Sequence, residues 1–496
     1  MAGVKWSYLG SLAAGVLQFG MTAVMARLLN PAAFGLIALA GVVLRFVDHF
    51  ARAGVTQALI QKPQLSQTDV RAAFTLSVAS GTAFAIIAAS AAEFAAGLVN
   101  EPELVPVLRW LSLAMVLNGF GATAVALLRR RLRFKELALI DVSAYGLGYM
   151  VVGLGMALAG AGVYALVAAL LSQMAIRTIA AYLLIRHPLS PTRSRESLVA
   201  IMSYGGRVSL IGFFEFLQSN MDALLIGRWV GAAQLGLYNR ARMIGELPTS
   251  QLTLGLSKVL FPSFSAIQLE HRRLRSVYLS AVGAASALIM PLNAGMAVAA
   301  PEIVLVLLGP QWVGAIEVLP WLLLASTLTL LGYFPGIVAE AQAALNAKLL
   351  VAVISTGTLG LLLLAAKGGP LAAYGAAVAA TAAVSHLGYL TIISFSLKTS
   401  FRSLLQPYVR SVIAAMLVAT AIATCRFLLL QVNASTILVL AMEVLTGAIT
   451  LALLVRFGPL TPYREDLAIR LTNAGLLAGT DPASKSLRWF LRPPMA

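Results

Sequence analysis

The organisation of this chain is clearest from residues 222 to 242, which read Asp222-Ala-Leu-Leu-Ile-Gly-Arg-Trp-Val-Gly-Ala-Ala-Gln-Leu-Gly-Leu-Tyr-Asn-Arg-Ala-Arg242. The centre of this stretch, 228–241, is a degraded copy of Arg27-Leu-Leu-Asn-Pro-Ala-Ala-Phe-Gly-Leu-Ile-Ala-Leu-Ala40, which lies 201 positions earlier. One copy stands near the start of each half of the chain. The pair therefore predicts an internal duplication.

Two further pairs of segments support the duplication. Val107-Leu-Arg-Trp-Leu-Ser-Leu-Ala114 matches Val318-Leu-Pro-Trp-Leu-Leu-Leu-Ala325 at a shift of 211 positions. Gly162-Val-Tyr-Ala-Leu-Val-Ala-Ala169 resembles Ala372-Ala-Tyr-Gly-Ala-Ala-Val-Ala379 at a shift of 210. The three pairs keep the same order and nearly the same spacing, so we expect two lobes of related fold.

The composition is that of a polytopic, all-α membrane protein. Hydrophobic residues make up 59% of the 496 residues and charged residues 11%, with a mean hydropathy of +0.87. A hydrocarbon core about 30 Å thick needs about 20 apolar residues per helical span. The sequence predicts fourteen such spans. They are 5–28, 32–52, 70–93, 105–128, 138–159, 162–185, 201–227, 233–262, 275–299, 316–345, 348–367, 371–397, 406–430 and 435–456.

The net charge of +17 is distributed as a topology signal. Lys and Arg gather in alternate connections, most densely at Arg129-Arg-Arg-Leu-Arg133. Because short cytoplasmic loops carry the excess of Lys and Arg, both termini should face the cytoplasm. The charge then attracts anionic lipid headgroups, and we expect membrane lipids rather than nucleic acid as partners.

Six spans separate the two copies of the repeated block, so the copies share one orientation and the repeat is parallel. The hydrophilic segment between the halves is rich in Arg, Ser and Pro, which is typical of a linker. The predicted organisation is an N-lobe at 1–186, a cytoplasmic linker at 187–200, a C-lobe at 201–397, two extra helices at 398–456 and a cytoplasmic tail at 457–496.

Polar stripes mark three of the predicted helices. An ionisable residue in mid-membrane costs at least about 2.5 kcal/mol, so such residues should face a partner or a watery cavity. The stripes occupy equivalent helices of the two predicted lobes, so we expect them to line a cleft between the lobes. The candidate substrate-binding residues are Arg45, Asp48, Arg52, Arg207, Glu215, Gln218, Asn220, Asp222, Tyr238, Arg242 and Glu246.

A structural explanation of these residues stays open. Arg45 and Asp48, like Arg242 and Glu246, have the spacing of opposite charges that neutralise each other along a helix. Arg52 lies near a span end, where its side chain can reach the interface. Asp222 has no cation adjacent in sequence, and Asn220 and Arg207 are its candidate partners.

Other functional classes lack their sequence features. No predicted exterior connection is longer than about twenty residues, so an enzyme of polysaccharide assembly would have no place for its acceptor site. The four histidines have no metal-ligand spacing, and Cys425 is the single cysteine. We therefore expect no enzyme, no metal and no cofactor.

Several short motifs, taken together with residues 27–35, resemble one known family. They are Ala58-Leu-Ile-Gln61, Arg129-Arg-Arg-Leu-Arg-Phe134, Asp222-Ala-Leu-Leu-Ile-Gly-Arg228, Leu235-Gly-Leu-Tyr238, Leu260-Phe-Pro262 and Leu308-Gly-Pro-Gln-Trp312. The family is the polysaccharide transporter family, of the Wzx-like, colanic-acid-exporter type. It belongs to the superfamily of multidrug, oligosaccharidyl-lipid and polysaccharide exporters.

The resemblance implies two six-helix lobes plus two extra C-terminal helices in a bacterial inner membrane. It implies a flippase that moves undecaprenyl-diphosphate-linked oligosaccharide to the periplasmic leaflet by alternating access, with other membrane proteins of polysaccharide assembly as candidate partners. Related flippases use cationic residues on the first two helices of each lobe. The matching positions here are Arg45, Arg52, Arg207 and Arg242.

An ion-coupled multidrug exporter of the same superfamily is the alternative. Such a pump needs an acidic cleft that attracts cations, and Glu215, Asp222 and Glu246 keep this reading open. Arginine is nevertheless prominent among the candidates, and its planar guanidinium binds diphosphate oxygens in pairs. The sequence therefore favours the flippase.

Overall fold

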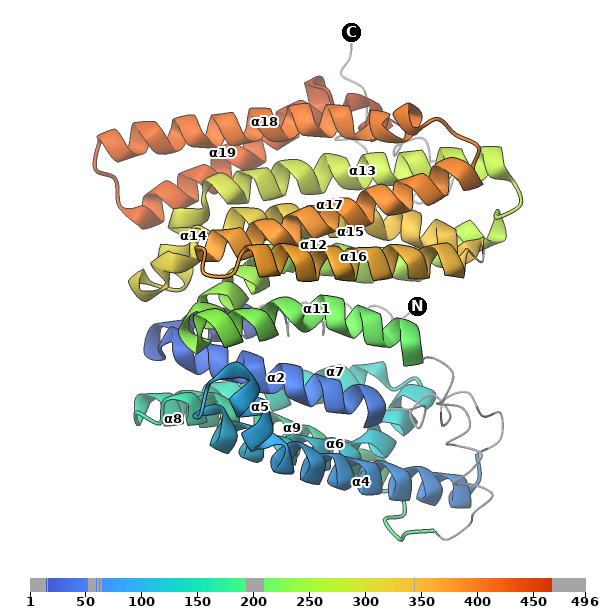
Figure 1. Ribbon diagram of the computed structural model, residues 1–496, viewed down its shortest axis with the longest axis vertical. Helices are drawn as coiled ribbons and strands as arrows, with labels where there is room; N and C mark the ends of the chain where they lie inside the picture. Colours follow the sequence, from blue (N-terminus) through green and yellow to red (C-terminus); the bar gives the residue numbers. More distant parts are fainter. Residues whose placement is uncertain are drawn as a thin grey trace. The chain divides into compact units, whose positions relative to one another are not determined.

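The computed structural model describes residues 15, 17–51, 59, 62, 65–192, 209–342 and 344–465, with side chains except at 47–51, 209–215, 251–252, 254–263 and 345. All regular secondary structure in these residues is helical (Figure 1). The chain divides into two compact units, Met1–Asn239 and Arg240–Ala496. Each unit is described by itself.

In its described residues, the first unit contains a helix over residues 17–28 and nine labelled elements. These are α2 (Pro31–Ala51), α4 (Gln67–Ser90), α5 (Ala92–Val99), α6 (Leu104–Arg130), α7 (Phe134–Tyr145), the π-helix η1 (Gly146–Gly153), α8 (Leu154–Leu158), α9 (Val163–Ile185) and α11 (Ser209–Val230). The elements α7, η1 and α8 follow one another without a break and form a single span over Phe134–Leu158.

Local sequence explains where these helices begin. The side chain of Asn30 accepts a hydrogen bond from the backbone N–H of Ala33 at 2.9 Å, and Pro31 stands at the first helical position of α2. Ser66 and Asp69 form a capping box at the start of α4. Each device satisfies backbone N–H groups that the first turn of a helix leaves without a partner.

Polar contacts join the helices of the first unit. The Thr178 hydroxyl of α9 donates to the carbonyl oxygen of Leu117 in α6 at 3.0 Å. At the end of α6, Arg130 donates to the carbonyl oxygens of Leu59 and Lys62 at 2.7 and 2.6 Å. This part of the predicted cytoplasmic basic run therefore fastens the connection between α2 and α4.

The second unit begins inside α12 (Ala232–Ala266), whose first turns belong to the first unit. The elements that follow are α13 (His271–Val298), α14 (Ala300–Leu307), the 3₁₀-helix η2 (Pro310–Ala315), α15 (Leu319–Ala341), α16 (Leu345–Ala365), α17 (Leu371–Ser396), α18 (Phe401–Gln431) and α19 (Thr436–Phe457). Figure 1 shows α13 and α18 running side by side, and the serine hydroxyls of Ser286 and Ser411 join them at 2.9 Å.

Ten helices of the described part are long and apolar enough to cross a membrane. They are Gln67–Ser90, Leu104–Arg130, Phe134–Leu158, Val163–Ile185, His271–Val298, Leu319–Ala341, Asn346–Ala365, Leu371–Ser396, Phe401–Gln431 and Thr436–Phe457. Each corresponds to one of the predicted spans. Large side chains such as Phe395 and Ile437 are 80% and 70% exposed, which suits contact with lipid. The chain is a multi-pass membrane protein.

The total of fourteen spans stays a prediction. The four predicted spans that are not among the ten are 5–28, 32–52, 201–227 and 233–262. The first lies largely outside the described residues, and the other three overlap α2, α11 and α12. These last three are the helices with the predicted polar stripes. Each has side chains outside the described residues, and the described apolar part of α2 spans Pro31–Phe46.

The division into units differs from the predicted lobes. The structural boundary falls between Asn239 and Arg240, whereas the sequence places a linker at 187–200. The difference arises because α11 packs against α2 and α5 and is therefore grouped with the first unit. The predicted domain boundaries stay predictions, and 193–208 and 466–496 lie outside the described residues.

Candidate functional site

The two copies of the repeated block adopt the same local structure in the first unit. In each, one helix ends, the chain turns over one or two residues, and a new helix begins. The first copy turns at Asn30 and starts α2 at Pro31. The second turns at Gly231, where φ is 94°, and starts α12 at Ala232. A left-handed φ favours glycine, which explains why a glycine stands where the other copy has asparagine.

The two copies also touch each other reciprocally. A Cβ added at Gly35 in α2 would overlap the carbonyl oxygen of Ala232 in α12, and one added at Gly236 would overlap the carbonyl oxygen of Pro31. Each contact maps onto the other at the shift of 201 residues found in the sequence. We name these four residues the glycine junction. Such closeness permits Cα–H···O contacts and tight van der Waals packing between helices.

Two polar groups hold the second copy against α5. The backbone N–H of Ala232 donates to Oε1 of Glu101 at 2.6 Å. Arg228 donates to the carbonyl oxygen of Leu98, the penultimate residue of α5. Neither Glu101 nor Arg228 was among the site residues predicted from the sequence. Arg228 is the first residue of the second copy, whereas Glu101 lies far from both copies in sequence and had no such signal. Both satisfy backbone groups at helix ends.

Asp222 lies buried in α11. It is 2% exposed, and its Oδ2 accepts a hydrogen bond from the hydroxyl of Tyr238 at 2.6 Å. Tyr238 is 1% exposed. The sequence named Asn220 and Arg207 as candidate partners of Asp222; the structure shows Tyr238 in this role, and Arg207 lies outside the described residues. The pair links α11 to α12 across the turn.

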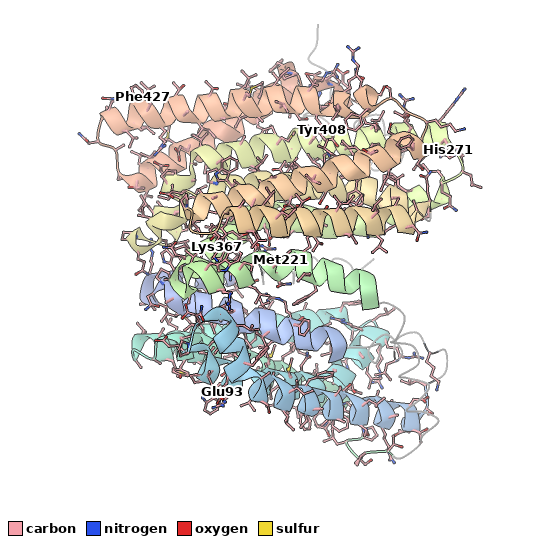
Figure 2. All side chains as sticks on the ribbon, viewed as in Figure 1. Glu93, Met221, His271, Lys367, Tyr408 and Phe427 are labelled. Carbon is pink, nitrogen blue, oxygen red and sulfur yellow. The ribbon has the colours of Figure 1, made fainter. Side chains whose placement is uncertain are left out.

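Arg45 meets Asn220 on another side of α11. Its Nε and Nη2 donate to Oδ1 of Asn220 at 3.2 and 2.9 Å, while Nδ2 of Asn220 donates to the carbonyl oxygen of Phe216 at 2.8 Å. Asn220 is buried and Arg45 is exposed. Residues 220 and 222 are about 200° apart around a helix, which explains why Asn220 and Asp222 have separate partners. Met221 marks this turn of α11 in Figure 2.

In the second unit, Arg242 and Glu246 form the ion pair that their spacing predicted. Nε of Arg242 donates to Oε1 of Glu246 at 2.7 Å, and the two side chains are 28% and 52% exposed. An ion pair of this exposure contributes at most about 1 kcal/mol to stability. The ion pair is therefore a weak one, and both side chains stay partly exposed.

The other candidates are only partly placed. Gln218 is half-buried in α11. Asp48 and Glu215 lie on α2 and α11, with side chains outside the described residues, and Arg52 is outside them altogether. The structure therefore brings Arg45 together with Asn220, Asp222 with Tyr238, and Arg242 with Glu246. The shared cleft and the role of every candidate in it stay predictions. Within the described residues, no group of three His, Cys, Asp or Glu side chains is arranged to hold a metal ion.

The chain matches a known protein family over most of its length. A family described as "Polysaccharide biosynthesis protein" matches residues 24–317, more than half of the chain. The matched part includes both copies of the repeated block and the glycine junction.

Curated relatives carry names from polysaccharide assembly in bacteria. The succinoglycan biosynthesis transport protein ExoT of Rhizobium meliloti is 29% identical over 433 residues, which cover 86% of each chain. The lipopolysaccharide biosynthesis protein WzxC of Escherichia coli is 24% identical over 345 residues, covering 69% of this chain and 70% of the relative.

Solved structures share the fold at low sequence identity. The lipid II flippase MurJ in an inward closed conformation superposes with a TM-score of 0.67 at 12% identity, covering 91% of this chain and 98% of MurJ. An inward-facing multidrug transporter of the MATE family has a TM-score of 0.53 at 18% identity, covering 79% of this chain and 96% of the transporter. The chain therefore has the fold of the multidrug and polysaccharide exporter superfamily.

Proposed function

We propose that this chain, which belongs to the polysaccharide biosynthesis protein family, translocates undecaprenyl-diphosphate-linked oligosaccharide across the bacterial inner membrane. Both termini face the cytoplasm in this proposal, and the product serves exopolysaccharide, capsule or O-antigen assembly. The chain acts as a transporter and not as an enzyme, in agreement with the transport protein among its relatives.

The observation that carries the proposal is the exposed guanidinium of Arg45, oriented by the buried carboxamide of Asn220. A diphosphate that leaves water needs fixed hydrogen-bond donors, and a guanidinium offers two parallel N–H groups to phosphate oxygens. The carboxamide of Asn220 is itself fixed, because its Nδ2 donates to the carbonyl oxygen of Phe216. Its Oδ1 therefore holds the guanidinium of Arg45 in one orientation. A preorganised arginine loses less side-chain entropy when the ligand arrives.

The second group in the proposed cleft is Arg242 with Glu246. Because this pair is exposed and weak, a diphosphate can displace Glu246 from the guanidinium at small cost. When the headgroup departs, Glu246 pairs with Arg242 again. A competing carboxylate of this kind favours release, which transport requires as much as binding.

Alternating access in this proposal requires the glycine junction to open and close. With both termini cytoplasmic, the turns at Asn30 and Gly231 lie at the periplasmic end of their helices. Contact between α2 and α12 there closes the outer end of the pathway, as expected for an inward-open state. Separation of the same two helices would open it to the periplasm.

The test is export by substituted proteins in cells that lack the native gene. Arg45→Lys keeps the charge but loses the planar pair of donors, Arg45→Gln removes the charge, and Arg45→Glu reverses it. Loss of a charged hydrogen-bonding pair costs about 1.5–3 kcal/mol, or roughly a 10- to 150-fold loss of affinity. Export should therefore fall in the order Lys, Gln, Glu, with lipid-linked intermediates retained in the cytoplasmic leaflet.

Arg109→Gln is the matched control. Arg109 is an exposed arginine whose Nη2 donates to Glu93 at 2.8 Å on the surface of the first unit. This variant should export normally. Normal export by Arg45→Glu would remove the arginine from the mechanism, and transport of cationic dyes without any effect on lipid diphosphates would favour the multidrug exporter.

A further inference from the structure

Three helices of the second unit bring two carboxyl groups and one guanidinium together. Glu302 lies in the first turn of α14, Arg426 lies five residues before the end of α18, and Glu443 lies in the second turn of α19. Both α14 and α18 pack against α19. Phe427, next to Arg426, marks this end of α18 in Figure 2. None of the three residues was selected from the sequence.

One of the two carboxyl groups is paired and the other is not. Nε of Arg426 donates to Oε1 of Glu302 at 2.9 Å. Oε2 of Glu302 and both carboxyl oxygens of Glu443 are buried and have no hydrogen-bond partner among the described residues. Glu443 is 1% exposed and lies within electrostatic range of both Glu302 and Arg426. The cluster therefore has three acceptor oxygens that await a donor.

The orientation of Glu443 is unusual for its helix. Most of α19 is exposed, and its buried residues in the described structure are Val439 and Glu443. Glu443 is also the single acidic residue of α19. A helix that faces lipid on most sides thus turns its one carboxyl group inward, toward a second carboxyl group. Acidic residues placed in this way within a membrane mark functional sites.

Within the described residues, the helices packed most extensively against α19 bring no second cation to the cluster. These helices are α13, α14 and α18. After Arg275, α13 carries no charged residue, and α14 carries only Glu302. Beside Arg426, α18 contributes the thiol of Cys425 as its one other titratable group in the last three turns. Arg456 lies thirteen residues beyond Glu443 on α19, about 20 Å away along the helix.

Two buried carboxylates beside one guanidinium leave a net negative charge. An unpaired buried charge is costly, and a carboxyl group in this position takes up a proton instead of staying ionised. The proton also supplies the missing donor, because a protonated carboxyl O–H can donate to the free Oε2 of Glu302. We propose that Glu443, Glu302 and Arg426 form a binding site for one exchangeable proton, carried mainly by Glu443.

A proton fits this site better than a metal ion does. Hard cations take about six oxygen ligands, and the described residues supply two carboxyl groups with a guanidinium already beside them. When the site binds a proton from water, a carboxylate becomes a carboxylic acid. When the site releases the proton to water, the carboxylate forms again. This inference goes beyond the proposed function, since proton binding needs no transported substrate.

The test is infrared difference spectroscopy of the purified full-length protein in lipid nanodiscs while the pH is stepped. A protonated buried carboxyl group gives its own carbonyl stretching band. We expect a band that grows as the pH falls and that is lost in Glu443→Gln, which preserves the shape of the neutral acid. Glu93→Gln, at an exposed glutamate of the first unit, is the matched control and should keep the band.

Two further variants test the pairing. Glu302→Gln frees Arg426 to balance Glu443, so the midpoint of the band should move to lower pH. Arg426→Gln removes the only cation of the cluster, so protonation should persist to higher pH. A band that Glu443→Gln leaves unchanged, no band at any pH, or a midpoint that Glu302→Gln does not lower would each overturn the proposal. Binding of sodium in competition with the proton would also overturn it.

Discussion

Substitution of Gly35 by alanine tests whether the glycine junction controls access to the transport pathway. The added methyl group overlaps the carbonyl oxygen of Ala232, which belongs to the backbone and cannot rotate away. The helices α2 and α12 must therefore move apart. Gly155→Ala is the matched control, because a Cβ at Gly155 has no neighbour within 4 Å.

The magnitude follows from the cost of overpacking, which is about 1–3 kcal/mol at a tight contact. The higher helix propensity of alanine stabilises the open and closed states alike, because α2 is a helix in both, so it does not offset this cost. The ratio of closed to open molecules should therefore fall roughly 5- to 150-fold. Gly236→Ala should have a similar effect, since its contact with Pro31 is the equivalent one.

The assay is a distance measurement between spin labels on the two copies. Cysteines replace the exposed residues Leu28 and Ala233, after Cys425 has been replaced by serine. Gly35→Ala should shift the distance distribution toward longer values and reduce export, whereas Gly155→Ala should change neither. If Gly35→Ala keeps both the distance distribution and the export of the parent protein, the junction is not a moving contact and the reasoning is refuted.

Two predictions concern stability. Tyr238→Phe leaves the buried Oδ2 of Asp222 without this hydroxyl donor, so the free energy of unfolding should fall by about 1.5–3 kcal/mol. Thermal unfolding in detergent measures this change. A double-mutant cycle with Asp222→Asn should show that the two substitutions are coupled rather than additive. His187 follows α9 and is packed between Phe74 and Tyr182. Burial lowers the pKa of its imidazole below the usual 6.5, and a hydrogen bond to the neighbouring carbonyl oxygen of Pro188 opposes this lowering. The folded protein favours the neutral imidazole. The contribution of His187 to the free energy of unfolding is therefore complete above pH 6.5, the pKa in the unfolded chain, and is lost as the pH falls toward the lower pKa in the folded protein. His187→Phe should flatten this part of the pH profile, and an unchanged slope would assign the effect to other groups.

The sequence by itself determined the ten long apolar helices and their approximate bounds. An apolar run of about 20 residues is a local property, and the cost of an unpaired backbone group in lipid allows only a helix there. Local caps such as Asn30 and Ser66 then set the first residue of the helix that follows. The repeated block could be recognised in the sequence because a turn between two helices is also a local property, and both copies encode such a turn.

Only the tertiary structure decided which polar groups meet. Arg45 donates to Asn220, which lies 175 residues away in sequence, and nothing in the sequence pairs these two residues. The inward orientation of Glu443 was equally hidden. In a soluble protein, alternation of polar and apolar residues reveals the buried face of a helix, whereas a helix in lipid is apolar on every side. Which face of such a helix packs against its neighbours is therefore decided by the shapes of its side chains and by single polar contacts. These contacts form only when the helices assemble.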